Sequence, residues 1–214
     1  MPVGHRQWTL RISPPTFGMG SVSNYTGLYL VDADCVDENI QHPDTFVAWP
    51  NSGDFPIQYF VNSEYTDTIP LVPWSVSLGA QYAYFSLDDE RITLRRERDG
   101  KIWTFNKNTQ YTQLCNYGDN DYMMFNADNG YYGLQKTLIF MPAWGSIGEI
   151  KHDDVFEVTV DGIRLVSGEP TQLKYSVKFF DLYNPKGWKR HLNRRPIRRL
   201  YRRLRCRRRR WGTR

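Results

Sequence analysis

Short apolar segments of strand length follow one another along residues 43–183, and turn residues separate them. Many of these segments alternate apolar and polar residues, which is the period of a β-strand with one buried face. Helical periodicity is hard to find before residue 186. The pattern predicts a mainly β fold, an antiparallel β-sandwich of about seven to nine strands over residues 43–183. The expected strands, with the first as an edge, are FVAW, PIQYFVN, WSVSL, QYAYFSL, RITLRRE, KIWTF, MMFN, TLIFMP, VFEVTVDGI and LKYSVKFFDL.

Two Asp-Gly pairs mark expected turns within this region. Asp99-Gly100 lies at the centre of LRRERDGKIWTF and predicts a two-residue hairpin turn, because glycine tolerates the positive φ that such turns need. Asp161-Gly162 is a second turn candidate of the same kind. Twelve prolines, sixteen glycines and an aromatic share of 15% favour an all-β chain with many turns.

Residues 1–42 are expected to form a separate first unit. The segment GHRQWTL ends at the prolines of SPP, after which FGMGSV and TGLYLVDAD have the character of two strands. Two adjacent strands alone bury too little apolar surface to be stable.

The charge of the chain is divided unevenly. The segment 186–214 holds thirteen Arg, two Lys and no acidic residue, so its net charge is +15. Of the 28 basic residues, 13 remain for residues 1–185, which hold all 23 acidic residues and therefore carry a net charge of −10. A polycationic segment binds nucleic acid or an anionic surface through counterion release, without sequence specificity. The arginines expected to make these contacts are Arg194, Arg195, Arg198, Arg199, Arg202, Arg203, Arg205, Arg207, Arg208, Arg209 and Arg210.

Residues 184–214 are predicted to be a tail that is either disordered or helical. Ile197, Leu200, Tyr201 and Leu204 are three or four positions apart, as in a basic amphipathic helix. Tyr201 and Trp211 could stack on bases. The alternative is that this tail is an extension in a changed reading frame.

The stretch GHRQWTLRISPPTFGMGSV resembles the late part of the bacterial CAP superfamily, also called the SCP-like domain, which is related to cysteine-rich secretory and pathogenesis-related proteins. The resemblance lies in a Gly-His-Arg tripeptide, an apolar segment, a proline-bearing loop and a Gly-x-Gly strand. These appear here as Gly4-His5-Arg6, Trp8-Thr9-Leu10, Pro14-Pro15 and Gly18-Met19-Gly20.

This resemblance implies that residues 1–42 are the C-terminal remnant of a CAP domain and that residues 43–183 are similar to the β-rich extension found in some secreted relatives. The family's cavity is lined by two histidines and two glutamates. Only His5, with Arg6 beside it, matches that pattern, so a truncated chain without a metal site is expected. The implied role is non-catalytic, extracellular binding of a glycan or a protein, although the chain shows no signal peptide.

The aromatic residues offer a candidate ligand platform. These aromatics lie in or near predicted strands, where they could stack on a sugar: Trp49, Tyr59, Trp74, Tyr82, Tyr84 and Trp103. The three tryptophans, Trp49, Trp74 and Trp103, are the first candidates. The alternative is that these rings form the core of the sandwich, since each buries a large area.

Other polar motifs favour structure over chemistry. The sequence KHDD around His152 is typical of a polar turn, although an Asp-His pair could serve as a general base. The stretch 118–130 is rich in Asp and Asn, which favours turns over a calcium site because the order of an EF-hand loop is missing. No nucleophile motif or phosphate-binding loop stands out, so neither an enzyme nor a cofactor is expected. A disulfide between Cys35 and Cys115 stays open.

A second class of function competes with the extracellular binding module. A β-sandwich with an Arg-rich arm is also the general plan of small viral capsid proteins, in which the arm neutralises phosphates. No run of about eighteen apolar residues occurs, so no transmembrane helix is predicted.

Overall fold

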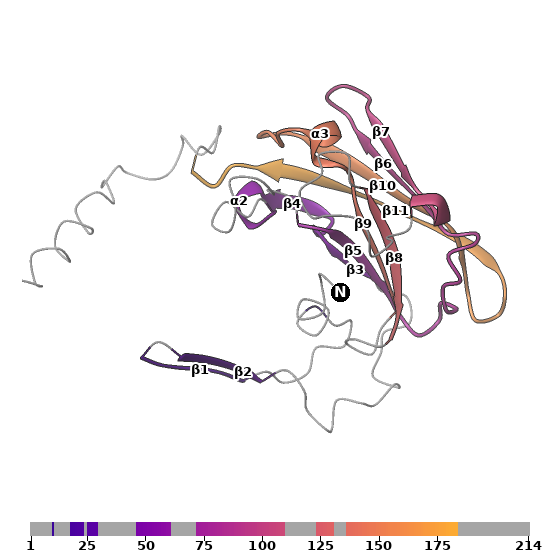
Figure 1. Ribbon diagram of the computed structural model, residues 1–214, viewed down its shortest axis with the longest axis horizontal. Coiled ribbons are helices and arrows are strands. Elements are labelled where there is room, and N and C mark those ends of the chain that lie inside the picture. The colour runs from indigo at the N-terminus through magenta and orange to yellow at the C-terminus, as the bar shows by residue number, and fades with distance from the viewer. Residues whose placement is uncertain are drawn as a thin grey trace, which may run out of the picture. The chain divides into compact units, whose positions relative to one another are not determined.

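The computed structural model describes residues 10, 18–23, 25–29, 46–60, 72–109, 123–130 and 136–183 (Figure 1). The chain divides into two compact units, Met1–Leu182 and Tyr183–Arg214. The first unit contains two packed sheets and a separate hairpin. The predicted mainly β fold is therefore confirmed.

Nine strands of the described residues build the two sheets. The order of the five-stranded sheet is β4-β11-β10-β6-β7, and that of the four-stranded sheet is β3-β5-β9-β8. Every neighbouring pair in the two sheets is antiparallel except β4 and β11, which pair in parallel at one edge of the five-stranded sheet. The strands are β3 (Phe46–Trp49), β4 (Gly53–Pro56), β5 (Trp74–Leu78), β6 (Arg91–Arg96), β7 (Ile102–Phe105), β8 (Met124–Asn129), β9 (Lys136–Met141), β10 (Val155–Arg164) and β11 (Pro170–Phe180).

The first two predicted strands form a hairpin of their own. β1 (Gly18–Val22) pairs with β2 (Tyr25–Tyr29) in antiparallel register, with Val22 opposite Tyr25 next to the turn. The remaining helical elements are short: α2 (Ile57–Phe60), α3 (Trp144–Ile147) and the 3₁₀ helix η3 (Lys107–Thr109).

The hairpin predicted at Asp99-Gly100 is confirmed, although its turn is longer than two residues, and the turn predicted at Asp161-Gly162 is wrong. Asp99 and Gly100 lie between β6 and β7, where the N–H of Arg96 donates to the carbonyl of Lys101 and so closes a loop of residues 97–100; Gly100 has a φ of 68°. Strand β10 instead runs through Asp161-Gly162, where a register shift against β11 marks a bulge. A Cβ atom at Gly162 would lie 2.0 Å from the carbonyl oxygen of Asp89. Glycine is thus required at this position by a close approach of another backbone, as is common at bulges.

Two other predicted strands are also corrected. Within PIQYFVN, residues Ile57–Phe60 form α2, because β4 ends at Pro56 and a proline favours the start of a helix. Within QYAYFSL, Tyr82 forms only an isolated bridge with Leu165. The alternating residues of this segment therefore form a loop, because the segment does not pair with a neighbouring strand along its length.

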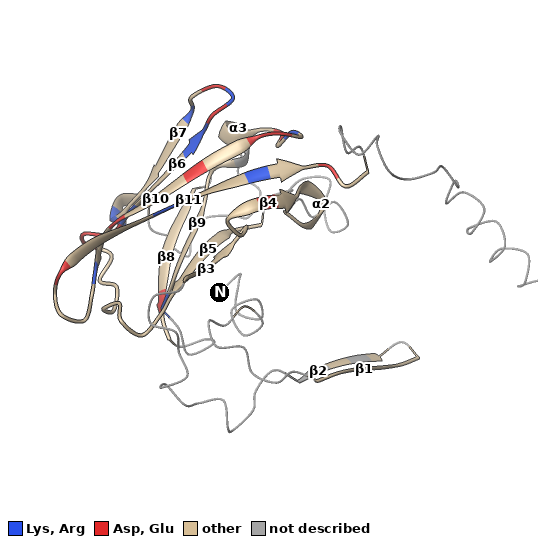
Figure 2. Ribbon diagram, turned by 180° about the vertical axis from the view of Figure 1, so that it is seen from behind, with Lys and Arg blue, Asp and Glu red and all other residues tan. Residues whose placement is uncertain are grey.

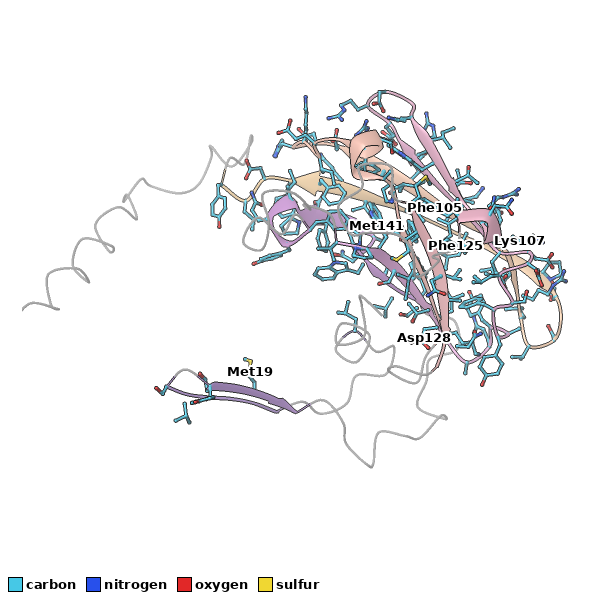
Figure 3. All side chains as sticks on the ribbon, in the orientation of Figure 1. Met19, Phe105, Lys107, Phe125, Asp128 and Met141 are labelled. Atoms are coloured by element: carbon cyan, nitrogen blue, oxygen red, sulfur yellow. The ribbon has the colours of Figure 1, made fainter. Side chains whose placement is uncertain are left out.

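Aromatic rings fill the space between the sheets. The ring of Trp74 lies 5.3 Å from Phe60 of α2, 5.7 Å from Phe140 of β9 and 5.7 Å from Phe156 of β10. Phe105 of β7 and Phe125 of β8 are fully buried and point into the same core (Figure 3). Burial of this many aromatic side chains supplies the main driving force for folding.

The outer surfaces of the two sheets differ. β10 and β11 alternate buried and exposed residues, so the outer face of the five-stranded sheet meets solvent. All five residues of β5 and five of the six in β9 are buried, which means that both faces of the four-stranded sheet are covered there. Charged side chains accordingly lie mostly on the five-stranded sheet and its loops (Figure 2).

Candidate functional site

The tryptophans predicted to stack on a ligand lie mainly inside the sandwich. Trp74 is fully buried and Trp103 is 5% exposed. Trp49 is half-buried, with its ring centroid 4.8 Å from that of Phe55. Stacking on a sugar needs an exposed ring face, so the burial of Trp74 and Trp103 corrects their predicted role and places them in the core.

Several predicted site residues lie outside the described residues. These include His5 and Arg6 of the Gly-His-Arg tripeptide, and Cys35 and Cys115. The Arg-rich segment from Arg194 to Arg210 lies outside them as well. The roles assigned to these residues therefore stay predictions.

Arg96 forms a buried polar clamp together with Trp103. Its guanidinium carbon lies 5.4 Å from the ring centroid of Trp103 and 5.9 Å from that of Phe156. The Nη1 atom donates a hydrogen bond of 2.6 Å to the carbonyl of Ile147 in α3. Arg96 is only 4% exposed, so these contacts replace the water that its charge would otherwise bind. The indole Nε1 of Trp103 donates to Ser146 Oγ at 2.7 Å and joins β7 to α3.

The same arginine sets the electrostatics of the β6–β7 turn. Arg96 donates from Nε and Nη2 to the two carboxylate oxygens of Asp99, at 3.0 Å and 2.6 Å. These hydrogen bonds are the main cause that lowers the pKa of Asp99 from 3.8 to about 2, and the backbone N–H of Lys101 adds to the effect. Arg98 pairs with the buried Asp154 at 3.1 Å, which connects the hairpin to the turn before β10. The cluster is a structural connection between β6, β7, α3 and β10.

Two of the tyrosines named as candidate stacking aromatics are exposed on the surface. Tyr59 of α2 is 65% exposed and Tyr84 is 72% exposed. Lys136 Nζ lies 5.1 Å from the Tyr84 ring centroid and donates to the carbonyl of Tyr82. For these two rings the alternative of burial in the core is therefore wrong, and their faces meet solvent.

The outer face of the five-stranded sheet carries charges of both signs. Arg95 pairs with Glu157 at 2.7 Å across β6 and β10. Lys178 of β11 pairs with Asp153 at 3.1 Å. Both pairs are about half exposed, so solvent screens them. A face of mixed sign offers no extended positive surface to a polyanion.

The end of β11 is held by side chains from two other segments. Asp181 donates its backbone N–H to Nδ1 of His152 at 3.0 Å. Gln58 of α2 accepts the backbone N–H of Leu182 at 3.1 Å and donates to the carboxylate of Asp181. The predicted polar turn at His152 is thus also the attachment point of the segment that leads into residues 186–214. Asp153 in this turn has a φ of 66°.

Within the part of the chain that the structure describes, no group of three or more His, Cys, Asp or Glu side chains could hold a metal ion. Among the helices formed by these residues, none is long and apolar enough to cross a membrane.

Comparison of the chain with protein-family models, with curated proteins and with solved structures found no match. The CAP resemblance of residues 4–22 therefore stays a prediction. What the protein binds has to be inferred from its own charges and geometry.

Proposed function

We propose that this chain is a non-catalytic binding protein in which the β-sandwich is a scaffold and residues 186–214 bind nucleic acid. The proposal rests on the net charge of +15 over the 29 residues 186–214, which contrasts with the net charge of −10 over residues 1–185. Thirteen of the fifteen basic residues are arginine, whose planar guanidinium forms paired hydrogen bonds to phosphate oxygens. The protein would recognise phosphate backbones, with little preference for base sequence.

Two features support nucleic acid as the polyanion. Tyr201 and Trp211 lie within the basic segment and can stack on bases, which contributes about 1–3 kcal/mol per base in single-strand binding. The mixed charges on the outer face of the five-stranded sheet provide no competing positive surface. The basic segment is therefore the part of the chain that supplies affinity.

The experiment measures the salt dependence of binding to a thirty-nucleotide single strand with the full chain. A plot of log Kd against log salt concentration should have a slope of about 0.7 per phosphate contact. A variant with Arg194, Arg195, Arg198 and Arg199 changed to Gln should lose up to about 3 from that slope. The matched control changes Arg91 and Lys174 on the sandwich to Gln, and should leave the slope within about 1 of the original.

Three results would contradict the proposal. The full chain could fail to bind at low salt, or the tail and control variants could lose the same slope. Binding to anionic vesicles that exceeds binding to the oligonucleotide would assign the segment to a membrane surface instead.

A second candidate function is a binding module for a glycan or a protein, as the CAP resemblance implies. The observation in its favour is the exposure of Tyr59 and Tyr84, which present large ring faces to solvent. Changing each of the two tyrosines to Ala should abolish retention on a glycan array if this candidate is right. The Arg-to-Gln tail variant should leave that retention unchanged, so the two functions are separable.

A further inference from the structure

The segment that follows β11 is fixed by a small set of hydrogen bonds. We call the residues Gln58, His152, Asp181 and Leu182 the C-terminal latch. Nδ1 of His152 accepts the backbone N–H of Asp181 at 3.0 Å, and Oε1 of Gln58 accepts the N–H of Leu182 at 3.1 Å. Gln58 also donates from Nε2 to the Asp181 carboxylate. The latch therefore orders the backbone four residues before the basic segment begins at Lys186.

The latch depends on the protonation state of His152. An imidazole nitrogen accepts a hydrogen bond only while it carries no proton. In the latched state the proton of the neutral ring is therefore on Nε2, which lies 3.5 Å from the Asp153 carboxylate. A second proton has to go to Nδ1, where the N–H of Asp181 already points. Two N–H groups then face each other and the hydrogen bond is lost.

The charged groups around His152 determine what replaces that bond. Asp153 lies beside it in the turn and is also paired with Lys178 of β11 at 3.1 Å. The carboxylate of Asp181 accepts a hydrogen bond from Gln58 of α2, which contributes no charge. A protonated ring still faces the Asp153 carboxylate with Nε2, while its Nδ1–H meets the N–H of Asp181. With 17% of its side chain exposed, His152 is open enough to exchange protons with solvent.

We propose that the C-terminal latch is a pH-sensitive device that opens when His152 takes up a proton. Histidine side chains change charge across the range between about pH 8 and pH 5. Opening releases the backbone N–H of Asp181, while Gln58 still holds the N–H of Leu182, so the end of β11 loses one of its two side-chain anchors. Use of the latch in nucleic-acid binding rests on the proposed function, whereas the latch itself does not.

The experiment follows amide hydrogen exchange of the full chain between pH 8 and pH 5, with each rate divided by its intrinsic rate. Protection of the Asp181 amide should fall about threefold to tenfold as the pH is lowered. In His152→Asn, the side-chain oxygen occupies the place of Nδ1 and does not titrate, so protection should stay constant. In Gln58→Ala, protection of the Leu182 amide should be low at every pH, while protection of the Asp181 amide should still fall as the pH is lowered.

A second measurement keeps the test valid if His152→Asn disturbs the turn. The imidazole chemical shifts of the unchanged protein should titrate with the same midpoint as the exchange of Asp181. Constant protection in the unchanged protein, or two different midpoints, would overturn the latch. Binding to the oligonucleotide is measured separately in the same buffers. If the protein does not bind the oligonucleotide but protection of the Asp181 amide still falls with pH, the proposed function is wrong and the latch is still supported.

Discussion

Replacing Arg96 with Ala should destabilise the sandwich far more than replacing its neighbour Arg95. The two arginines are adjacent in β6 and have opposite surroundings. Arg96 faces inward and is 4% exposed, whereas the Arg95 side chain is 45% exposed on the outer face. The comparison changes residue type and chain position as little as possible, so it isolates the effect of burial.

The expected loss follows from the contacts of the Arg96 guanidinium. Its two aromatic contacts, at 5.4 Å and 5.9 Å, contribute about 0.5–1 kcal/mol each. Its removal leaves the buried carbonyl of Ile147 without this donor, which costs about 1–3 kcal/mol. The free energy of unfolding should therefore fall by about 2–5 kcal/mol. Arg95→Ala removes one half-exposed ion pair with Glu157 and should cost less than about 1 kcal/mol.

Urea unfolding of both variants, followed by tryptophan fluorescence, measures this difference. The midpoint should shift strongly for Arg96→Ala and little for Arg95→Ala, with similar slopes. Equal shifts for the two variants would refute the assignment of Arg96 to a buried structural clamp.

The dependence of the free energy of unfolding on acid pH tests the contact between Arg96 and Asp99 in another way. The native pKa of Asp99 is about 2, below the ordinary value of 3.8, because Arg96 donates to its carboxylate. A lowered pKa of this kind adds stability above about pH 4, and that stability is lost as the pH falls towards 2. In Arg96→Ala the main cause of the shift is gone, so the pKa of Asp99, measured by carboxyl chemical shifts, should rise towards 3.8. A value that stays near 2 would contradict the role of Arg96.

Two further substitutions test the interior and the bulge. The buried hydroxyl of Tyr175 has no hydrogen-bond partner among the described residues, so Tyr175→Phe should raise the free energy of unfolding by about 1 kcal/mol. Burial raises the pKa of Tyr175 above its ordinary value of 10, so the unchanged protein should lose stability as the pH rises above 10. Tyr175→Phe should lose less over that range, and equal losses in alkaline urea titrations would contradict this account. Gly162→Ala should cost more than about 2 kcal/mol, since φ is 75° and the new Cβ would meet the Asp89 backbone. Gly100→Ala is the control, with φ of 68° and open space around it, and a thermal unfolding midpoint that falls equally in both variants would be inconsistent with the close approach.

Local pattern was enough to predict the parts of the fold that depend on near neighbours. The alternation in RITLRRE and KIWTF and the Asp99-Gly100 turn between them define β6, β7 and their hairpin. The two N-terminal strands, FGMGSV and TGLYLVDAD, likewise pair as β1 and β2. In each case the partner strand is adjacent in sequence, so turn chemistry and a period of two contain the needed information.

Features that depend on distant segments could not be predicted. Asp161-Gly162 has the local signature of a turn, but the backbone of Asp89 requires a glycine there within a continuing strand. The period of two places Arg96 on the same face as Ile92 and Leu94, yet its acceptor is Ile147, 51 positions away. His152 has the signature of a polar turn, while its hydrogen-bond donor lies 29 positions later. Single-sequence patterns do not contain such pairings.

The proposed function, in contrast to these distant pairings, can be predicted from the sequence, because the charge of a segment follows directly from its residues. The +15 of residues 186–214 requires no folding to act, and counterion release depends on how many phosphates it neutralises. The remaining 185 residues carry −10, so the two signs of charge are separated along the sequence. Each arginine that contacts a phosphate adds to the salt dependence of binding, whereas an arginine that contacts none adds nothing. A slope below that expected from fifteen charges would therefore give the number of basic residues that contact phosphate.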